Sequence, residues 1–222
     1  MIKVDLHVHT YRSPDALARP DDILRWARRR DIDMVAITDH DTITGALEMQ
    51  RRWPEFVIVG EEIKTSRGEI IGLFLKEEIP ARLPPAETIR RIRDQGGLVY
   101  VPHPTDRMRG SALAPDALLD IVEDVDILEV FNARVAFAAD NRLAEEFALT
   151  HGLARGAGSD AHYPTEVGRA YVEMPAFQTP PNFMGAIRQA RIHGRMASPL
   201  VHLSSRYARL AKAFMATLSP AR

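Results

Sequence analysis

Residues 4–10 read VDLHVHT, and this stretch directs the interpretation of the chain. The apolar run 3–8 has the composition of a β-strand and ends at His7 and His9. Residues two apart in a strand point to the same side, so both imidazoles face one way where the strand ends. A lone His-x-His also arises by chance. Whether this pair binds a metal therefore depends on which side chains from other segments lie beside it.

Composition limits the kinds of site that the chain can carry. Its 222 residues include no cysteine, which excludes disulfides, thiolate metal ligands and cysteine nucleophiles. The 29 basic and 30 acidic residues give a net charge of −1, so no extended nucleic-acid tract is expected as a partner. No apolar run has the length of a signal peptide or a membrane span. We therefore expect a cytoplasmic protein with no membrane partner. The oligomeric state stays open.

Runs rich in valine and isoleucine alternate with segments of helical period. Strands are predicted at 3–8, 34–38, 56–63, 69–75, 98–101, 127–131, 155–158 and 167–174, and helices at 21–30, 43–53, 86–94, 115–122, 138–151, 182–189 and 204–218. A turn at Arg67-Gly68 suggests a hairpin of the third and fourth strands. This alternation favours one α/β domain with a mostly parallel sheet, closed into a barrel or open and doubly wound. Residues from 180 to 222 are expected to form a C-terminal helical extension packed on the barrel.

Polar residues fall at the ends of the predicted strands, where barrels build their sites. They are His7 and His9, His40 in TDHDT, Glu61 and Glu62, His103 in VPHP, Glu129 and Asn132, and Asp160 and His162 in GSDAH. Each has an ordinary alternative, such as a polar turn or a helix cap. Their shared position instead predicts one metal site. Imidazole with carboxylate suits zinc, manganese or iron. The candidate ligands outnumber the four that one tetrahedral ion binds.

Six segments of the chain resemble the PHP (polymerase and histidinol phosphatase) superfamily, in the order that this family uses. They read DLHVHTYRSPDA, AITDHDTITG, VGEEI, VPHP, EVFNAR and AGSDAH, and span Asp5 to His162. The likeness is greatest to compact single-domain phosphoesterases. The resemblance implies a distorted (β/α)7 TIM-like barrel with a trinuclear metal site at its mouth.

The resemblance also implies a ligand set for two or three divalent ions, manganese, zinc or iron. One ion would be held by His7, His9, Glu62 and Asp160, a second by Glu62 and His103, and a third by Asp15, His40 and His162. The catalytic set would be His7, His9, Glu62, His103, Asp160 and His162. Side-chain alternation along a strand favours Glu62 over Glu61 as the bridging carboxylate.

The chain departs from the family pattern in two places. Some relatives carry a further histidine after the segment that matches EVFN, whereas this chain reads NARVAFAAD there. The second ion is then more weakly held, more open to water, or completed by another group. Glu69 stands where relatives often have histidine. It is a ligand, a partner of a ligand or an ordinary strand residue.

The implied reaction is hydrolysis of a small phosphorylated substrate by a metal-activated water. A nucleotide, a metabolite phosphate monoester and a short oligonucleotide all fit. Arg107, Arg109 and Arg134 follow the strand ends on loops and are predicted to bind the phosphate, because the guanidinium fork suits it. The alternative for such arginines is solvation or pairing with nearby carboxylates.

Two other functions remain open. Amidohydrolases that cleave C–N bonds also have His-x-His on the first barrel strand, but usually bridge their ions with a carboxylated lysine, where this chain has Glu62. A non-catalytic PHP interaction module would show degraded ligands, and here the set is nearly complete. His202 is either a surface residue or, if the C-terminal segment folds over the barrel mouth, part of the site.

Overall fold

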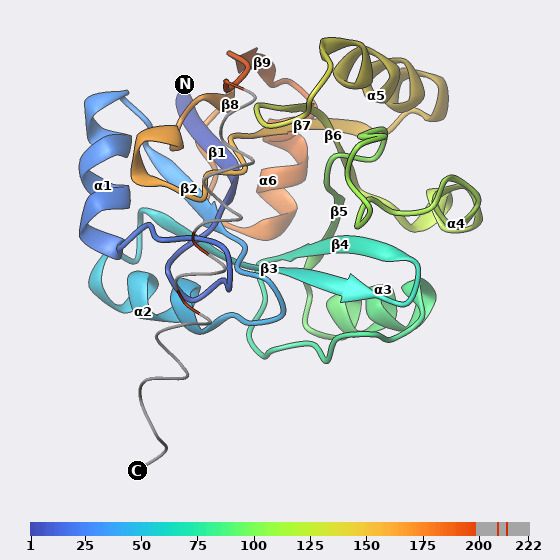
Figure 1. The fold of residues 1–222 in the computed structure, drawn as a ribbon, viewed down its shortest axis with the longest axis horizontal. Helices are drawn as coiled ribbons and strands as arrows, with labels where there is room; N and C mark the ends of the chain where they lie inside the picture. Colours follow the sequence, from blue (N-terminus) through green and yellow to red (C-terminus); the bar gives the residue numbers. More distant parts are fainter. Residues whose placement is uncertain (199–207, 209–211, 213–222) are drawn as a thin grey trace.

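The structure is a computed structural model in which residues 1–198, 208 and 212 are described. Strands and helices alternate along the described chain (Figure 1). The elements are β1 (Ile2–Val8), α1 (Pro20–Arg29), β2 (Met34–Ile37), α2 (Thr44–Arg52), β3 (Val57–Thr65), β4 (Gly68–Leu73), α3 (Pro85–Asp94), β5 (Leu98–Val101), α4 (Pro115–Asp120), η1 (Val122–Asp124), β6 (Ile127–Asn132), α5 (Ala138–His151), β7 (Ala154–Gly158), η2 (Pro164–Glu166), β8 (Ala170–Met174), α6 (Pro180–Ile187) and β9 (Arg191–Gly194).

Every strand and helix predicted up to residue 189 is present, with ends that differ by a few residues. Strand β9 was not expected from the sequence. Of the predicted helix 204–218 only residues 208 and 212 are described, and His202 lies outside the described residues. None of the described helices combines the length and the apolar character needed to cross a membrane.

The sheet curves into a nearly closed barrel with the order β7-β6-β5-β4-β3-β2-β1-β8-β9. The gap between β7 and β1 is bridged where the His9 amide donates to the Ala161 carbonyl at 2.9 Å. This arrangement confirms the predicted α/β barrel over an open doubly wound sheet. The sheet is mixed rather than mostly parallel, since β4 and β8 run antiparallel to the strands beside them. For β4 the reason is the short turn after Thr65, which folds it back on β3 as a hairpin.

Local sequence fixes the ends of the helices that surround the sheet. Pro20 begins α1, with Asp21 in the first turn and Arg29 in the last, an arrangement that complements the helix dipole. Helix α5 ends at Gly152, whose φ of 66° is left-handed and accessible to glycine without strain. The strand that follows each helix therefore starts at a defined position.

Apolar side chains form two layers, one on each face of the sheet. Outside, Ile23 of α1 and Met49 of α2 pack with strand residues such as Val59. Inside, Phe183 of α6 packs in a cluster with Val4, Tyr100 and other strand residues. Full burial of one such side chain stabilises the fold by about 1.5–3 kcal/mol.

An irregularity in β1 redirects its last side chains. The pairing of β1 with β2 shifts register between Asp5 and Val8. Before the shift, Val4 packs in the inner cluster with α6, and after it Val8 packs in the outer cluster with α1. A bulge of this kind bends a strand and re-aims its side chains. His7 and His9 thereby point together into the barrel mouth.

Candidate metal centre

Glu62, from β3, lies at the centre of the polar cluster. Its Oε2 is 3.4 Å from Nε2 of both His7 and His9 and 3.0 Å from Nδ1 of His40. Its Oε1 is 2.9 Å from Nε2 of His103. One buried carboxylate therefore contacts four imidazoles from three segments of the chain. The family resemblance assigns the bridging role to this residue.

The histidine pair of β1 faces a second carboxylate. Nε2 of His7 lies 3.1 Å from Nε2 of His9. Oδ1 of Asp160, from the loop after β7, is 3.8 Å from Nε2 of His7 and 3.4 Å from Nε2 of His9. Two nitrogens and an oxygen thus converge beside Glu62, and His7, His9 and Asp160 satisfy the spacing of a metal-binding group.

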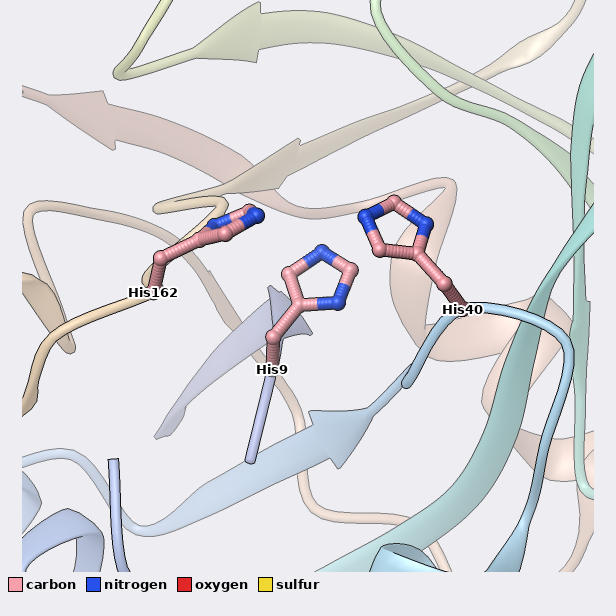
Figure 2. A group of neighbouring side chains, drawn as sticks. All are labelled: His9, His40 and His162. Carbon is pink, nitrogen blue, oxygen red and sulfur yellow. The ribbon is translucent and has the colours of Figure 1, made fainter. Parts of the chain in front are cut away.

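Three histidines from separate strand ends, His9, His40 and His162, face one another (Figure 2). The ring of His9 lies 4.5 Å from that of His40 and 4.3 Å from that of His162, centroid to centroid. Oδ1 of Asp15 is 3.5 Å from Nε2 of His40 and 3.3 Å from Nε2 of His162. The family resemblance assigns Asp15, His40 and His162 to one ion, and the structure brings these three side chains together. His9 contacts this group on one side and Asp160 on the other.

Glu69 of β4 lies in the cluster, on the side of His103. Its Oε2 is 3.7 Å from Nε2 of His103, and its Oε1 is 4.0 Å from Nδ1 of His40. Glu62 pairs with Ile71 across the hairpin, and residues 69 and 71 share a face of their strand. The two carboxylates therefore point into the same space. Glu69 therefore lies beside His103, the residue that the family resemblance assigns to a second ion.

The donor set fits divalent cations. Buried carboxylate oxygens of Glu62, Glu69 and Asp160 have no hydrogen-bond partner among the described residues. Buried acceptors are unfavourable unless paired, and a cation held by carboxylate and imidazole would pair them. Backbone strain agrees, because His103 and Asp160 have positive φ angles of 33° and 53°. Such angles are uncommon outside glycine and concentrate at functional sites.

Neighbouring charges lower the pKa values of two carboxyl groups in the cluster. Burial raises the pKa of the Glu62 carboxyl, but the His7 and His40 imidazoles outweigh it, and the net pKa lies well below the usual range. Burial likewise raises the pKa of Asp160, but the charges of Arg109 and His7 outweigh burial, and the net pKa lies well below its usual value. Both groups are therefore ionised at neutral pH, as ligands must be.

The histidines divide into two kinds. Burial, with His162 and His40 nearby, holds the pKa of His9 well below its usual value, so this imidazole is neutral. For His40, burial lowers the pKa, but Glu62 and Asp15 outweigh it and raise the pKa to about 10. A proton on His40 in the ion-free cluster would be displaced by a bound cation, so metal affinity should rise with pH.

Glu129 of β6 holds two of the clustered histidines. Its Oε1 lies 3.2 Å from Nδ1 of His7 and accepts the Tyr100 hydroxyl at 2.9 Å. Its Oε2 accepts the backbone amide of His103 at 2.7 Å and the Asn132 side chain at 2.9 Å. Carboxylates placed behind metal-ligating histidines fix ring orientation and tautomer. The sequence marked Glu129 as a strand-end residue but not as the partner of His7.

Asp39 and Ser13, which the sequence did not select as site residues, organise the loop after β1. Asp39 accepts the Thr10 amide at 2.7 Å and the Ser13 hydroxyl at 2.6 Å. Oγ of Ser13 lies 3.1 Å from Nδ1 of His9 and accepts the His40 amide at 3.1 Å. Short polar residues directly after a strand were the only sequence indication of this role.

Two other carboxylates near the cluster have different places. Asp5, two residues before His7, accepts backbone amides, those of Ser159 and Gly168 both at 2.8 Å. Glu61 points away from the cluster, as strand alternation predicts, and accepts the Ile79 amide at 2.9 Å. Asp5 therefore fixes the loop after β7, and Glu62 alone of the adjacent pair faces the ligands.

The three arginines predicted to bind phosphate occupy different surroundings. Arg109 contacts the carboxylate of Asp160, inside the cluster. Arg107 pairs with Asp140 at 2.7 Å, away from it. Arg134 is buried and pairs with Glu166 at 2.9 Å; Glu166 also accepts the His162 amide at 2.8 Å. Arg109 thus contacts a predicted ligand directly, and a substrate role for each of the three arginines stays a prediction.

The chain matches two family models and two relatives. Residues 5–84 match the model of the PHP domain, and residues 138–192 match a model described as PHP-associated. An uncharacterized protein of Methanocaldococcus jannaschii is 46% identical over 145 residues, which are 60% of this chain and 82% of that protein. A second uncharacterized protein of the same organism is 38% identical over 197 residues, which are 84% of this chain and 79% of that protein.

One solved structure has the same fold at low sequence identity. It is a two-domain protein from Bacteroides vulgatus described as containing a predicted PHP-like metal-dependent phosphoesterase. The TM-score is 0.72 with 18% identity, over 87% of this chain and 65% of the other. At this identity the likeness concerns the fold.

Proposed function

The chain belongs to the PHP superfamily, and we propose that it is a metal-dependent phosphoesterase acting on a small phosphorylated substrate. The observation that carries the proposal is the contact of the Glu62 carboxylate with four imidazoles, from His7, His9, His40 and His103. A carboxylate shared in this way suits adjacent ions, and sites of this kind act on phosphoryl groups. The net charge of −1 favours a nucleotide or metabolite phosphate over an extended nucleic acid.

We propose that the site holds two or three ions of manganese, zinc or iron. His7, His9, Glu62 and Asp160 would hold one; Glu62, His103 and Glu69 a second; and Asp15, His40 and His162 a third. When bound, such ions supply Lewis acidity, activate water and neutralise phosphate charge. Assigning Glu69 to the second ion supplies the ligand that relatives take from a later histidine, and makes that ion's surroundings richer in oxygen.

The protein's own groups contribute binding and orientation. Arg109 is placed to hold a phosphate oxygen while it fixes Asp160, since a guanidinium can contact both through different N–H groups. Its side chain is 17% exposed, so part of it reaches solvent at the mouth. Glu129 keeps the ring of His7 in place, which preserves the ligand geometry through turnover.

The two other functions are less well supported. A C–N hydrolase of the amidohydrolase kind would be expected to bridge its ions with a modified lysine, and Glu62 occupies the centre here. A non-catalytic module would not need so many buried, mutually repelling ionisable groups, which cost stability without a ligand.

The proposal is tested by assaying a panel of phosphorylated metabolites and nucleotides beside amide substrates, with manganese present. Phosphate release and no amide cleavage is the expected result. His9→Ala and Asp160→Ala should lower turnover by more than about 100-fold, beyond the loss typical of an outer-shell partner. Circular dichroism should show both variants folded. Amide cleavage alone, or full activity in either variant, would overturn the assignment.

A further inference from the structure

A second polar concavity lies on the outside of the barrel, between the end of α1 and strands β8 and β9. This arginine pocket has a volume of about 390 Å³ and is lined by Arg30, Arg169, Arg195, Tyr171, His193 and two glycines. None of the clustered metal-ligand candidates lines it. Its volume lies within the range of small-molecule sites.

Strand β9 builds the pocket. Its pairing with β8 sets Tyr171 opposite His193, and the Arg195 amide donates to the Arg169 carbonyl at 2.8 Å. Arg30 reaches across from the end of α1, where its guanidinium donates to the Thr165 carbonyl at 2.8 Å and to that of Val167. Three arginines from distant segments are therefore held around one space.

The arginines of the pocket have no ion-pair partner in the described part of the chain. None of Arg30, Arg169 and Arg195 forms an ion pair there, and no carboxylate lines the pocket. Two acids lie nearby: Glu173 contacts His193 at 3.1 Å, and the buried Asp5 accepts the Gly168 amide at 2.8 Å and partly offsets the charge of Arg30.

Two observations show that Arg169 and Arg30, which are both partly buried, have unmet interactions. Nε of Arg169 is buried and has no hydrogen-bond partner among residues 1–198, 208 and 212. Burial, and then the neighbouring Arg169, lower the pKa of the Arg30 guanidinium, so the two cations repel each other. An anion in the pocket would relieve the repulsion and accept the unused N–H groups.

We propose that the arginine pocket binds the phosphate group of a small anionic ligand. Guanidinium forks match the geometry of phosphate oxygens. A single carboxylate has too few oxygens to accept hydrogen bonds from three guanidinium groups, whereas a phosphate has enough. The rings of Tyr171 and His193 are stacked with centroids 5.0 Å apart and 12° between planes. They form an aromatic wall beside the arginines, suited to the base of a nucleotide. Free phosphate and a nucleotide both present the phosphate group that the arginines would bind.

The test is calorimetric titration of the full chain, treated with chelator so that ions at the barrel mouth do not bind phosphate, and checked for folding by circular dichroism. The probes are inorganic phosphate and AMP. Arg195→Ala is the main variant, because Arg195 is exposed and its loss should not disturb folding. Arg169→Ala is the second, and Arg28→Ala, an exposed arginine of α1 outside the pocket, is the matched control.

We expect saturable binding that both pocket variants weaken by at least about tenfold and the control leaves unchanged. Tighter binding of AMP than of phosphate would identify a nucleotide as the ligand, and equal binding would identify the phosphate group alone; either supports the proposal. No saturable binding of either probe at millimolar concentration would overturn it. So would unchanged affinity in both pocket variants. The result is independent of the proposed hydrolysis, because the two sites share no lining residue.

Discussion

Oε1 of Glu129 lies 3.2 Å from Nδ1 of His7, and both side chains are fully buried. The contact leaves Nε2 of His7 facing Glu62 and Asp160, the side from which a cation would be bound. Glu129 also accepts the amide of His103, so a single carboxylate fixes two predicted ligands from different strands.

Replacing this carboxylate should loosen metal binding while keeping the fold. We expect Glu129→Gln to lower metal affinity about 10- to 100-fold, because the His7 ring loses its charged partner. Competition with a chelating dye measures the affinity. Glu173→Gln, a substitution on β8 away from the cluster, is the matched control. Equal metal affinity in the two variants would show that the contact has no bearing on ion binding.

Arg109 and Arg107 are two residues apart and should behave differently. Loss of Arg109 removes a charged contact to Asp160 and the predicted phosphate ligand, so Arg109→Ala should raise KM about 10- to 100-fold. Arg107 pairs with the buried Asp140, so Arg107→Ala should lower Tm and leave KM close to that of the parent. Steady-state kinetics and thermal melts measure both. A larger KM effect for Arg107→Ala would reverse the assignment.

Glu69 should determine how many ions the cluster retains. We expect Glu69→Gln to lower the manganese content by about one ion per chain, because a neutral amide is a weak ligand for such ions. Elemental analysis after dialysis against manganese measures the content. The exposed Glu77→Gln serves as the control. Unchanged content would leave Glu69 as a neighbour of the ligands.

Glu61 should make the fold less stable as pH rises. Burial, with Glu78 and Asp41 nearby, raises the pKa of its carboxyl to about 8, from the usual 4.5. The folded state therefore keeps this proton where the unfolded state has lost it, and its contribution to stability is full below about pH 4.5 and lost by about pH 8.

Glu61→Gln removes this dependence while preserving the acceptor for the Ile79 amide. The Tm of the variant relative to the parent should therefore increase from pH 5 to pH 8 and stay level above. Thermal melts of chelated protein across this range provide the test. A constant difference would mean that Glu61 titrates normally in the folded protein.

The sequence predicted which polar side chains gather at the barrel mouth, because most of them end or follow a strand, and the family resemblance supplied their assignment to ions. His103 after LVYV and Asp160 after ARGAG could be placed without knowledge of the sheet order, since all such ends meet at one mouth. The hairpin of β3 and β4 was likewise visible in the turn before Gly68.

The supporting contacts could not be read from the chain. The partner of His7 is Glu129, 122 positions away, and only the closed barrel brings the two together. Strand β9 is short and partly exposed, and its residues RIHG carry no strong strand preference, so its existence depends on pairing with β8. The arginine pocket that it completes was invisible for the same reason.

The central claim is that imidazoles and carboxylates from separate strands hold a shared set of divalent cations. Elemental analysis of protein purified without chelator and then supplied with manganese tests it most directly, with Glu62→Gln measured alongside. We predict about two or three ions per chain in the parent and a marked loss in the variant. Fewer than about one ion per chain in the parent, or equal content in the two proteins, would contradict the account.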